Sequence, residues 1–282
     1  MSFDLSQLGH WSDEKEFKVE ADRAKAYAAA TNDDVEAHAA GEIAPPIFAV
    51  VPVWEAMGLA SAQALSPDLL PFVVHGEQDI RFHQVIRPGQ VLVSKAAPVG
   101  VHAKGSGTTV VTKTETRDEN GDLVNEQYFT TFVRGVTAEE SGGEAAPGHR
   151  FPEELRDEAP AATVTQRFDD DQTFRYSEAS GDLMPIHLDD EFARNVGLPG
   201  IIIHGLCTMA FTSHAVVSTV CEGDTTRLKR LAVRFSKPAL PGQEITTTIW
   251  RAGENDGATV YAFETATADG DVVIKDGLAE VG

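Results

Sequence analysis

Two side chains that could exchange protons lie close together in the second half of this 282-residue chain. Asp182 and His187 are five residues apart in the run Asp-Leu-Met-Pro-Ile-His. Pro185 fixes its own φ and disfavours a helical conformation at Met184, so we expect a loop that aims both side chains at one point. A carboxylate and an imidazole that face one small target suit acid–base chemistry on a water molecule and a carbon atom.

A third candidate is Gly205, which follows His204 near the start of a long apolar helix predicted over residues 201–223. The N–H groups in the first turn of a helix have no partners within it, and the helix dipole is positive there. A glycine at this point allows a carbonyl oxygen to approach the backbone closely. The sequence therefore predicts an oxyanion hole, with Asp182, His187 and Gly205 as the catalytic residues.

Each of these residues also has an ordinary structural interpretation. Asp182 alone would cap a helix or turn, His187 would be a packed or surface histidine, and Gly205 would be a helix-packing glycine. Their order and spacing together favour a single site. His204 flanks that site, where it would either cap the helix or orient a ligand.

The helices and strands predicted around these residues occur in the same order in both halves of the chain. A short strand and an Ala-rich helix over residues 17–31 precede a second helix over residues 51–66, and strand-like runs then continue to residue 135. Residues 136–162 are rich in Glu, Ala, Pro and Gly and show no apolar period, which indicates a linker. Strand, helix, loop, long helix and four strands then return over residues 163–282. This order predicts an α+β fold in which an antiparallel sheet surrounds a helix in each half.

The two halves also share sequence. The run YAAATND from Tyr27 aligns with YSEASGD from Tyr176, an offset of 149 residues. The run RFHQVIRPGQ from Arg81 aligns with RFSKPALPGQ from Arg234, an offset of 153 residues. We predict an N-terminal unit over residues 1–135 and a C-terminal unit over residues 163–282, related by a pseudo-twofold as in a fused homodimer. Further pairing into a homodimer is compatible with this.

Composition narrows the possible partners. A formal charge of −21 repels nucleic acid and anionic membranes, and with 42% apolar residues the chain can build real cores. No apolar run is long enough to span a bilayer and the N-terminus does not resemble a signal peptide, so we expect a cytoplasmic protein. The two cysteines, Cys207 and Cys221, lie in apolar surroundings and indicate reduced core thiols rather than a zinc site.

The motif resembles that of the MaoC-like, R-specific enoyl-CoA hydratase family of hot-dog folds, some members of which contain two fused units. The matching residues are Tyr176, Ser180, Gly181, Asp182, Pro185, Ile186, His187, His204 and Gly205. The resemblance implies that Asp182 and His187 activate a water that adds to the β-carbon of a trans-2-enoyl thioester, while the Gly205 N–H holds the thioester oxygen. It implies an R-3-hydroxyacyl product and a reaction that needs no metal or redox cofactor. CoA would be part of the substrate and not a cofactor.

The chain departs from the family pattern at Met184, where the family has an asparagine. Methionine cannot donate a hydrogen bond. The first half keeps Asp33 and His38 at the same spacing of five but lacks the proline and the His-Gly turn, so we interpret it as non-catalytic. The substrate contacts that we expect are Met184, Pro185 and His204 at the motif, with Phe48 and Trp54 among the residues of the first half that line an acyl pocket.

The phosphates of CoA or of an acyl-carrier protein require cations in this acidic chain. The densest basic cluster is Arg227, Lys229, Arg230, Arg234 and Lys237, and we predict that Arg230, Arg234 and Lys237 contact the substrate. The other interpretation is that these are ordinary edge-strand charges that deter aggregation.

Two other functions stay open at the level of sequence. A hot-dog thioesterase would need a carboxylate on a central helix, and Glu55 is a candidate for it. A non-catalytic acyl-binding protein is the third possibility, and the methionine at position 184 makes it plausible.

Overall fold

The computed structural model describes residues 3–282, which pack into two compact units. The first unit contains the chain up to Lys18 together with residues 52–84 and 90–148. The second contains residues 19–51, 85–89 and 149–282. A segment of the first half therefore packs with the second half. The predicted boundaries at residues 135 and 163 describe the repeat in the sequence and stay a prediction.

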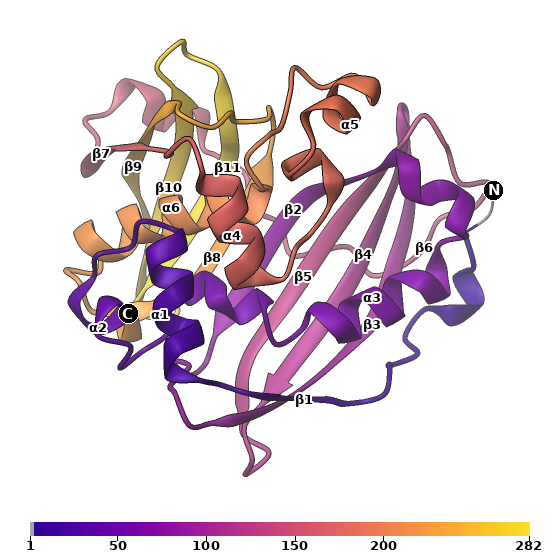
Figure 1. Ribbon diagram of the computed structural model, residues 1–282, viewed down its shortest axis with the longest axis horizontal. Helices are drawn as coiled ribbons and strands as arrows, with labels where there is room; N and C mark the ends of the chain where they lie inside the picture. Colours follow the sequence, from indigo (N-terminus) through magenta and orange to yellow (C-terminus); the bar gives the residue numbers. More distant parts are fainter. Residues whose placement is uncertain (1–2) are drawn as a thin grey trace. The chain divides into compact units, whose positions relative to one another are not determined.

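The first unit is an antiparallel sheet with one main helix. Its strands lie in the order β1-β3-β4-β5-β2, and the short β6 pairs with β3. Helix α3 (Trp54–Ala64) packs on β3 and β4 (Figure 1). The strand bounds are β1 Lys15–Lys18, β2 Val73–Phe82, β3 Val91–Lys104, β4 Gly107–Arg117, β5 Leu123–Arg134 and β6 Gly142–Gly143.

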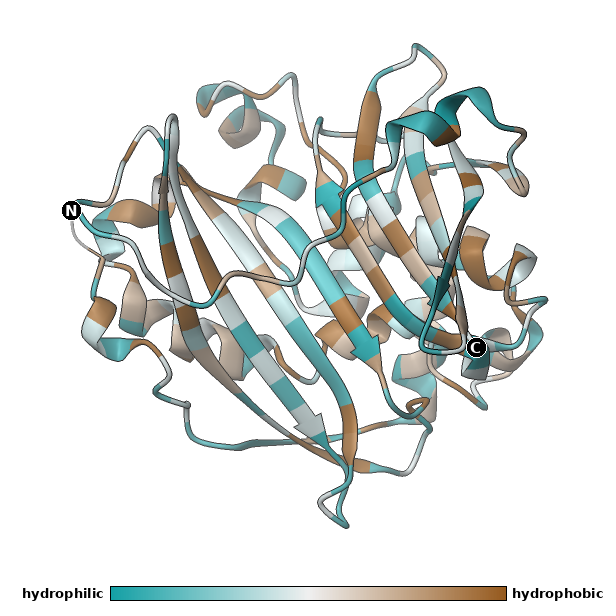
Figure 2. Cartoon of the chain, turned by 180° about the vertical axis from the view of Figure 1, so that it is seen from behind, coloured by the Kyte–Doolittle hydropathy of each residue, from teal (hydrophilic) through white to brown (hydrophobic). Residues whose placement is uncertain are grey.

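The second unit repeats this topology. Its strands lie in the order β7-β9-β10-β11-β8, all antiparallel, so the first, third, fourth, fifth and second strands are neighbours in both units. The repeat predicted from the sequence is thus present in the strand order. The bounds are β7 Ala162–Arg167, β8 Leu228–Phe235, β9 Glu244–Asn255, β10 Ala258–Thr267 and β11 Val272–Val281. Many strands of both units alternate hydrophobic and hydrophilic residues (Figure 2), which is the pattern of a sheet with one buried face.

The two main helices differ in how much of their surface they bury. Helix α6 (Gly205–Thr219) packs on β7, β8, β9 and β11, and nearly every residue from Leu206 to Val217 is buried. Helix α3 buries only the stripe Ala56, Ala60 and Ala64. Helix α6 is therefore buried on all sides within its unit, whereas α3 buries only the face that packs on its sheet. Cys207 lies within α6, and burial raises the pKa of its thiol above the usual range.

Helices α1 (Ala21–Ala30) and α4 (Gln172–Ser180) pack against each other in the second unit (Figure 1). The hydroxyls of Tyr27 and Tyr176 are 3.1 Å apart, and both side chains are buried. These tyrosines are equivalent in the repeat. The contact therefore joins the same position of the two copies of the repeat, between α1 and α4.

Short elements complete the chain. They are the helices α2 (Glu36–Ala39) and α5 (Asp190–Asn195) and single 3-10 turns at Leu5–Gln7, Pro46–Val50, Pro67–Phe72, Glu153–Asp157, Pro185–His187 and Thr225–Arg227. None of the helices within residues 3–282 is long and apolar enough to cross a membrane. The cytoplasmic location stays a prediction.

The Tyr27–Tyr176 contact yields a prediction for stability. Tyr27→Phe or Tyr176→Phe alone leaves one buried hydroxyl without its partner and should lower the free energy of unfolding by about 1–2 kcal/mol. The double variant removes both hydroxyls and should lie within about 0.5 kcal/mol of the wild type. Urea unfolding of the wild type, the two single variants and the double variant measures these free energies. Tyr261→Phe, at a half-buried position, is the control. Additive losses in the double variant would show that the two hydroxyls do not satisfy each other.

Candidate active site

The loop that carries Asp182 begins where α4 ends. Gly181 closes the helix in the left-handed region with φ +86°, and its N–H donates to the Ser177 carbonyl at 2.9 Å. The Asp182 carboxylate then accepts the Met184 N–H at 3.2 Å. Met184 is extended with φ −60° and ψ 129°, as the proline after it predicts. The turn thus fixes one oxygen of Asp182 and leaves the other carboxylate oxygen for chemistry.

His187 ends the 3-10 turn Pro185–His187 and is buried. Its Nδ1 lies 2.7 Å from the carbonyl oxygen of Ile202. A carbonyl can only accept, so Nδ1 carries the hydrogen and Nε2 keeps a lone pair. This contact sets both the orientation and the tautomer of the ring.

His204 packs directly on His187. The two ring centroids are 3.7 Å apart at an interplanar angle of 22°, and the Tyr176 ring lies at 4.8 Å on another side of His204. The Nε2 of His204 is 3.2 Å from the Asp182 backbone carbonyl and 3.1 Å from Ser177 Oγ. His204 therefore ties the start of α6 to both residues of the acid–base pair. No capping hydrogen bond from its side chain is found at α6.

Gly205 is the first residue of α6, so its N–H has no acceptor within the helix. A Cβ at this position would lie 3.2 Å from the ring of Phe235. Because Gly205 follows His204 directly, its N–H opens the helix beside the His187–His204 stack. The sequence prediction of a helix N-terminus at the acid–base pair is consistent with this placement.

Burial shifts the acid–base groups toward their uncharged forms. It raises the pKa of the Asp182 carboxyl above its ordinary value, while the attraction of His187 opposes the shift. It lowers the pKa of His187 below 6.5, against the hydrogen bond to Ile202. Burial also lowers the pKa of His204 to about 3. At neutral pH His204 is therefore uncharged, and burial disfavours the charged forms of both Asp182 and His187.

The residue types at this point would also suit a metal ion. One ligand atom from each of Asp182, His187 and His204 lies within 4.8 Å of the other two. Zinc bonds of about 2.1 Å in a tetrahedral site require ligand atoms about 3.4 Å apart. A spread of up to 4.8 Å fits hydrogen bonds to a small molecule better than metal coordination. The absence of a metal cofactor stays a prediction.

The predicted substrate contacts fall into different environments. Met184 and Pro185 are exposed, and the Met184 side chain is 53% exposed, so it does not pack into the acid–base pair. Phe48 is fully buried in the second unit and its ring meets Tyr27 edge-on at 5.5 Å. Trp54 begins α3 in the first unit. A substrate contact at any of these residues stays a prediction.

The basic cluster already has acidic partners. Arg230 pairs with Glu280 at 3.4 Å, Arg234 pairs with Asp276 at 3.2 Å, and Lys237 pairs with Asp271. These carboxylates come from β11 and the turn before it. The cations therefore neutralise acidic neighbours in the same unit, and a phosphate would have to compete for them. Contact with a phosphate at this cluster stays a prediction.

The first copy of the motif holds its Asp and His side chains in a different arrangement. Asp33 accepts the Val35 N–H at 3.1 Å, as Asp182 does from Met184. His38, however, bonds Asp33 directly through Nδ1 at 2.8 Å and Thr225 Oγ1 through Nε2 at 2.7 Å. His38 is fully buried, so both of its nitrogens are occupied by the protein. This supports the interpretation of the first copy as non-catalytic.

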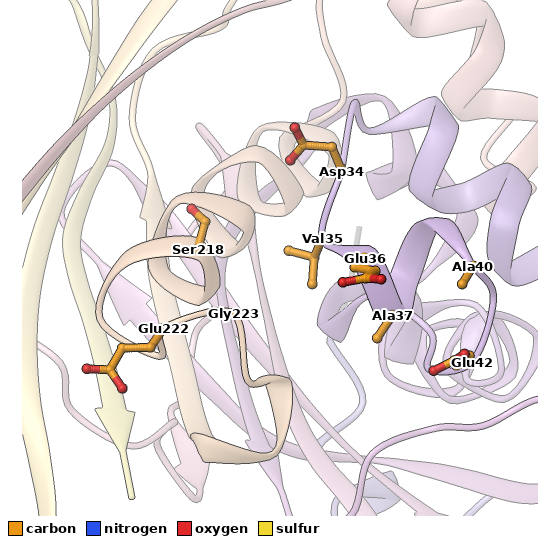
Figure 3. A pocket seen from close by; sticks show the side chains of 9 residues that line it. All are labelled: Asp34, Val35, Glu36, Ala37, Ala40, Glu42, Ser218, Glu222 and Gly223. Atoms are coloured by element: carbon orange, nitrogen blue, oxygen red, sulfur yellow. The ribbon is translucent and has the colours of Figure 1, made fainter.

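A separate pocket lies beside that first copy. It has a volume of about 610 Å³ and is lined by the segment from Asp34 to Glu42 and by the end of α6 (Figure 3). Its walls carry four carboxylates, those of Asp34, Glu36, Glu42 and Glu222. It contains none of the predicted site residues, and its charge disfavours anionic thioesters.

Sequence reasoning missed the groups that hold the catalytic side chains in place. The Ile202 carbonyl orients His187, but every residue has a carbonyl and the sequence carries no signal for this one. Ser177 contacts His204 from α4 and gave no signal either, since its hydroxyl could equally have bonded the helix backbone.

Comparisons with known proteins show what the whole chain is similar to. Residues 150–271 match the model of the MaoC like domain, and residues 36–135 match the MFE-2 hydratase 2 N-terminal domain. A probable enoyl-CoA hydratase 2 of Dictyostelium discoideum is 31% identical over 73% of this chain and 69% of its own length. The 3-hydroxyacyl-thioester dehydratase Y of Mycobacterium tuberculosis is 34% identical over 74% of this chain and 72% of its own length. The crystal structure of a MaoC-like dehydratase from Phytophthora capsici superimposes with a TM-score of 0.83 at 25% identity, covering 99% of this chain and 98% of that one.

The chain belongs to the MaoC-like family of hydratases and dehydratases. Within it, the match of the first half to the hydratase 2 domain and the repeated strand order identify a double hot-dog protein. The fold expected from the sequence is confirmed.

The two Asp–His pairs should respond oppositely to substitution. His38→Ala leaves Asp33 buried without its partner and should lower the free energy of unfolding by about 3 kcal/mol, while turnover per folded molecule stays the same. His187→Ala should lower turnover by about 10²–10⁴-fold at a smaller cost in stability. His38→Ala and His187→Ala are compared by denaturant unfolding and by turnover measured on the same samples. Loss of turnover in His38→Ala without a loss of stability would contradict a structural role for the first copy.

Proposed function

We propose that this protein catalyses the reversible hydration of trans-2-enoyl-CoA thioesters to R-3-hydroxyacyl-CoA thioesters. The observation that carries the proposal is the grouping of Asp182 and His187 within 4.8 Å of each other beside the N-terminus of α6. The names of the Dictyostelium and Mycobacterium relatives point to the same chemistry in its two directions.

The tautomer of His187 assigns the two proton transfers. His187 Nε2 accepts a proton from the water as the water oxygen bonds to the β-carbon. The electrons of the double bond move toward the thioester, which becomes an enolate. Asp182 in its protonated form then gives its proton to the α-carbon, and the product carries one added water. A proton passing from His187 to Asp182 restores the starting state.

The enolate oxygen needs a donor that is in place before the reaction. The Gly205 N–H is free of helix partners and lies at the positive end of α6, and a glycine leaves the backbone open to the thioester. Such a preorganised donor contributes about 3–4 kcal/mol of transition-state stabilisation in comparable sites.

The geometry argues against the two alternative functions, a thioesterase and a non-catalytic acyl-binding protein. Glu55, the carboxylate that a thioesterase would use, has a side chain that is 70% exposed and pairs with Lys15 at 2.7 Å. It therefore lies on the solvent side of α3 and forms a surface ion pair. An acyl-binding protein without activity would have no need for a neutral imidazole held by a buried carbonyl contact next to an acid.

Substitution of the acid–base pair tests the proposal. Asp182→Asn and His187→Ala should each lower kcat by about 10²–10⁴-fold, because each removes one proton transfer. The assay follows loss of the enoyl absorbance and release of free thiol in parallel on a panel of trans-2-enoyl-CoAs. His10→Ala, at an exposed histidine, is the control and should retain wild-type rates.

The same assay separates the three functions. Loss of the enoyl absorbance without release of free thiol indicates a hydratase, and release of free thiol indicates a thioesterase. Tight binding of the enoyl-CoA with no change in absorbance and no release of thiol indicates a non-catalytic acyl-binding protein. Full activity in either Asp182→Asn or His187→Ala would contradict the assignment of the site.

The pKa of His187 predicts the acid side of the pH profile. The base must be unprotonated, and burial lowers its pKa below the ordinary 6.5, so the imidazole stays unprotonated to lower pH than a free histidine would. The midpoint of the acid-side fall in kcat/KM for hydration should therefore lie below pH 6.5. Initial rates in constant-ionic-strength buffers measure this, and a midpoint above 6.5 would contradict a buried, neutral base.

A further inference from the structure

His204 has a buried nitrogen that the protein itself leaves unused. Its side chain is 1% exposed, and its Nδ1 has no hydrogen-bond partner among the described residues. Its Nε2 contacts the backbone carbonyl of Asp182, which can only accept. Nε2 therefore carries the hydrogen and Nδ1 carries a lone pair. A buried acceptor without a donor is costly, so a ligand that donates a hydrogen bond is expected at Nδ1.

The surroundings indicate a ligand of the size of water. One oxygen or nitrogen from each of Asp182, His187 and His204 lies within 4.8 Å of the others, and Nδ1 is the His204 nitrogen that has no partner among the described residues. Three atoms with this spread can all be reached from one point no more than 4.8/√3, about 2.8 Å, away from each. That distance is an ordinary hydrogen bond to a water oxygen.

The donors and acceptors also balance around one water. His187 Nε2 and His204 Nδ1 both offer lone pairs, because Ile202 and Asp182 accept the hydrogens of the opposite ring nitrogens. A water can donate one hydrogen bond to each ring and accept one from the Asp182 carboxyl in the protonated form that the proposed reaction uses. One lone pair of the water is then left for the β-carbon.

We propose that His204 Nδ1 is the third hydrogen-bond partner of the attacking water, which makes His204 a catalytic residue of the hydration. The inference rests on the proposed function, since it names the group that holds the water in that reaction. Met184 does not compete for this role, because its side chain has no donor and is half-exposed. The 3.7 Å stack on His187 keeps the two imidazoles in a fixed relation. The water is thus held by three side chains before the substrate arrives.

A crystal structure of the wild-type protein at a resolution that shows ordered water is the direct test. The expected result is one water within hydrogen-bond distance of His204 Nδ1, His187 Nε2 and the Asp182 carboxyl. A structure with no water at His204 Nδ1 overturns the proposal, and this readout does not require a substrate or an active enzyme.

Kinetics of two variants provide the second test. His204→Phe keeps a ring between Tyr176 and His187 but removes both nitrogens, and should lower kcat about 100-fold with KM for the enoyl-CoA changed less than about threefold. Ser177→Ala is the matched control, because it removes a neighbour of Nε2 and leaves Nδ1 intact, and it should cost at most about fivefold. Equal losses in the two variants would assign the effect to the Nε2 contacts and overturn the proposal.

The outcomes also separate this inference from the proposed function. A wild-type protein that holds the water but hydrates no enoyl thioester refutes the function and leaves the water site standing. A wild-type protein that hydrates enoyl thioesters with no water at His204 Nδ1 refutes the inference alone.

Discussion

The site depends on keeping an acid and a base close to each other without letting them neutralise one another by a direct bond. In the second copy, the Ile202 carbonyl takes the Nδ1 hydrogen of His187, and the ring then presents Nε2 toward the position that Asp182 also faces. In the first copy, His38 turns to Asp33 and the pair closes on itself. The same two residue types at the same spacing thus give side chains without a direct bond in one case and a hydrogen-bonded structural link in the other.

This difference arises from the turn between the two residues. In the second copy, Pro185 begins a single 3-10 turn that ends at His187. In the first copy, the corresponding segment forms the short helix Glu36–Ala39, which carries His38 into the interior, where Thr225 meets its second nitrogen. The first copy retains Asp33 and His38 for stability, because either one alone would be an unsatisfied polar group in the interior.

Much of this could be predicted from the sequence, for identifiable reasons. Most of the long strands were predictable because turn residues separate them, whereas the short β6 lies within the predicted linker. The candidate site could be proposed because Asp182, Pro185, His187 and Gly205 lie within one short stretch of sequence. The unused nitrogen of His204 was not predictable, since it depends on which nitrogen the Asp182 carbonyl and Ser177 meet in space. The closed pair in the first copy was not predictable either, because its third member, Thr225, is 187 residues from His38. Local sequence determines which side chains are available, but contacts between distant segments determine which of their atoms stay free.

The assignment of residues 19–51 to the second unit has an evolutionary consequence. Helix α1 packs on α4, and the turn Pro46–Val50 packs on α6, so part of the first half of the sequence supports the second unit. After a gene fusion of this kind, mutation can erase the chemistry of one copy, but deletion of that copy would remove part of the other's scaffold. The second unit therefore requires residues 19–51 for its packing, whether or not the first copy carries any chemistry of its own.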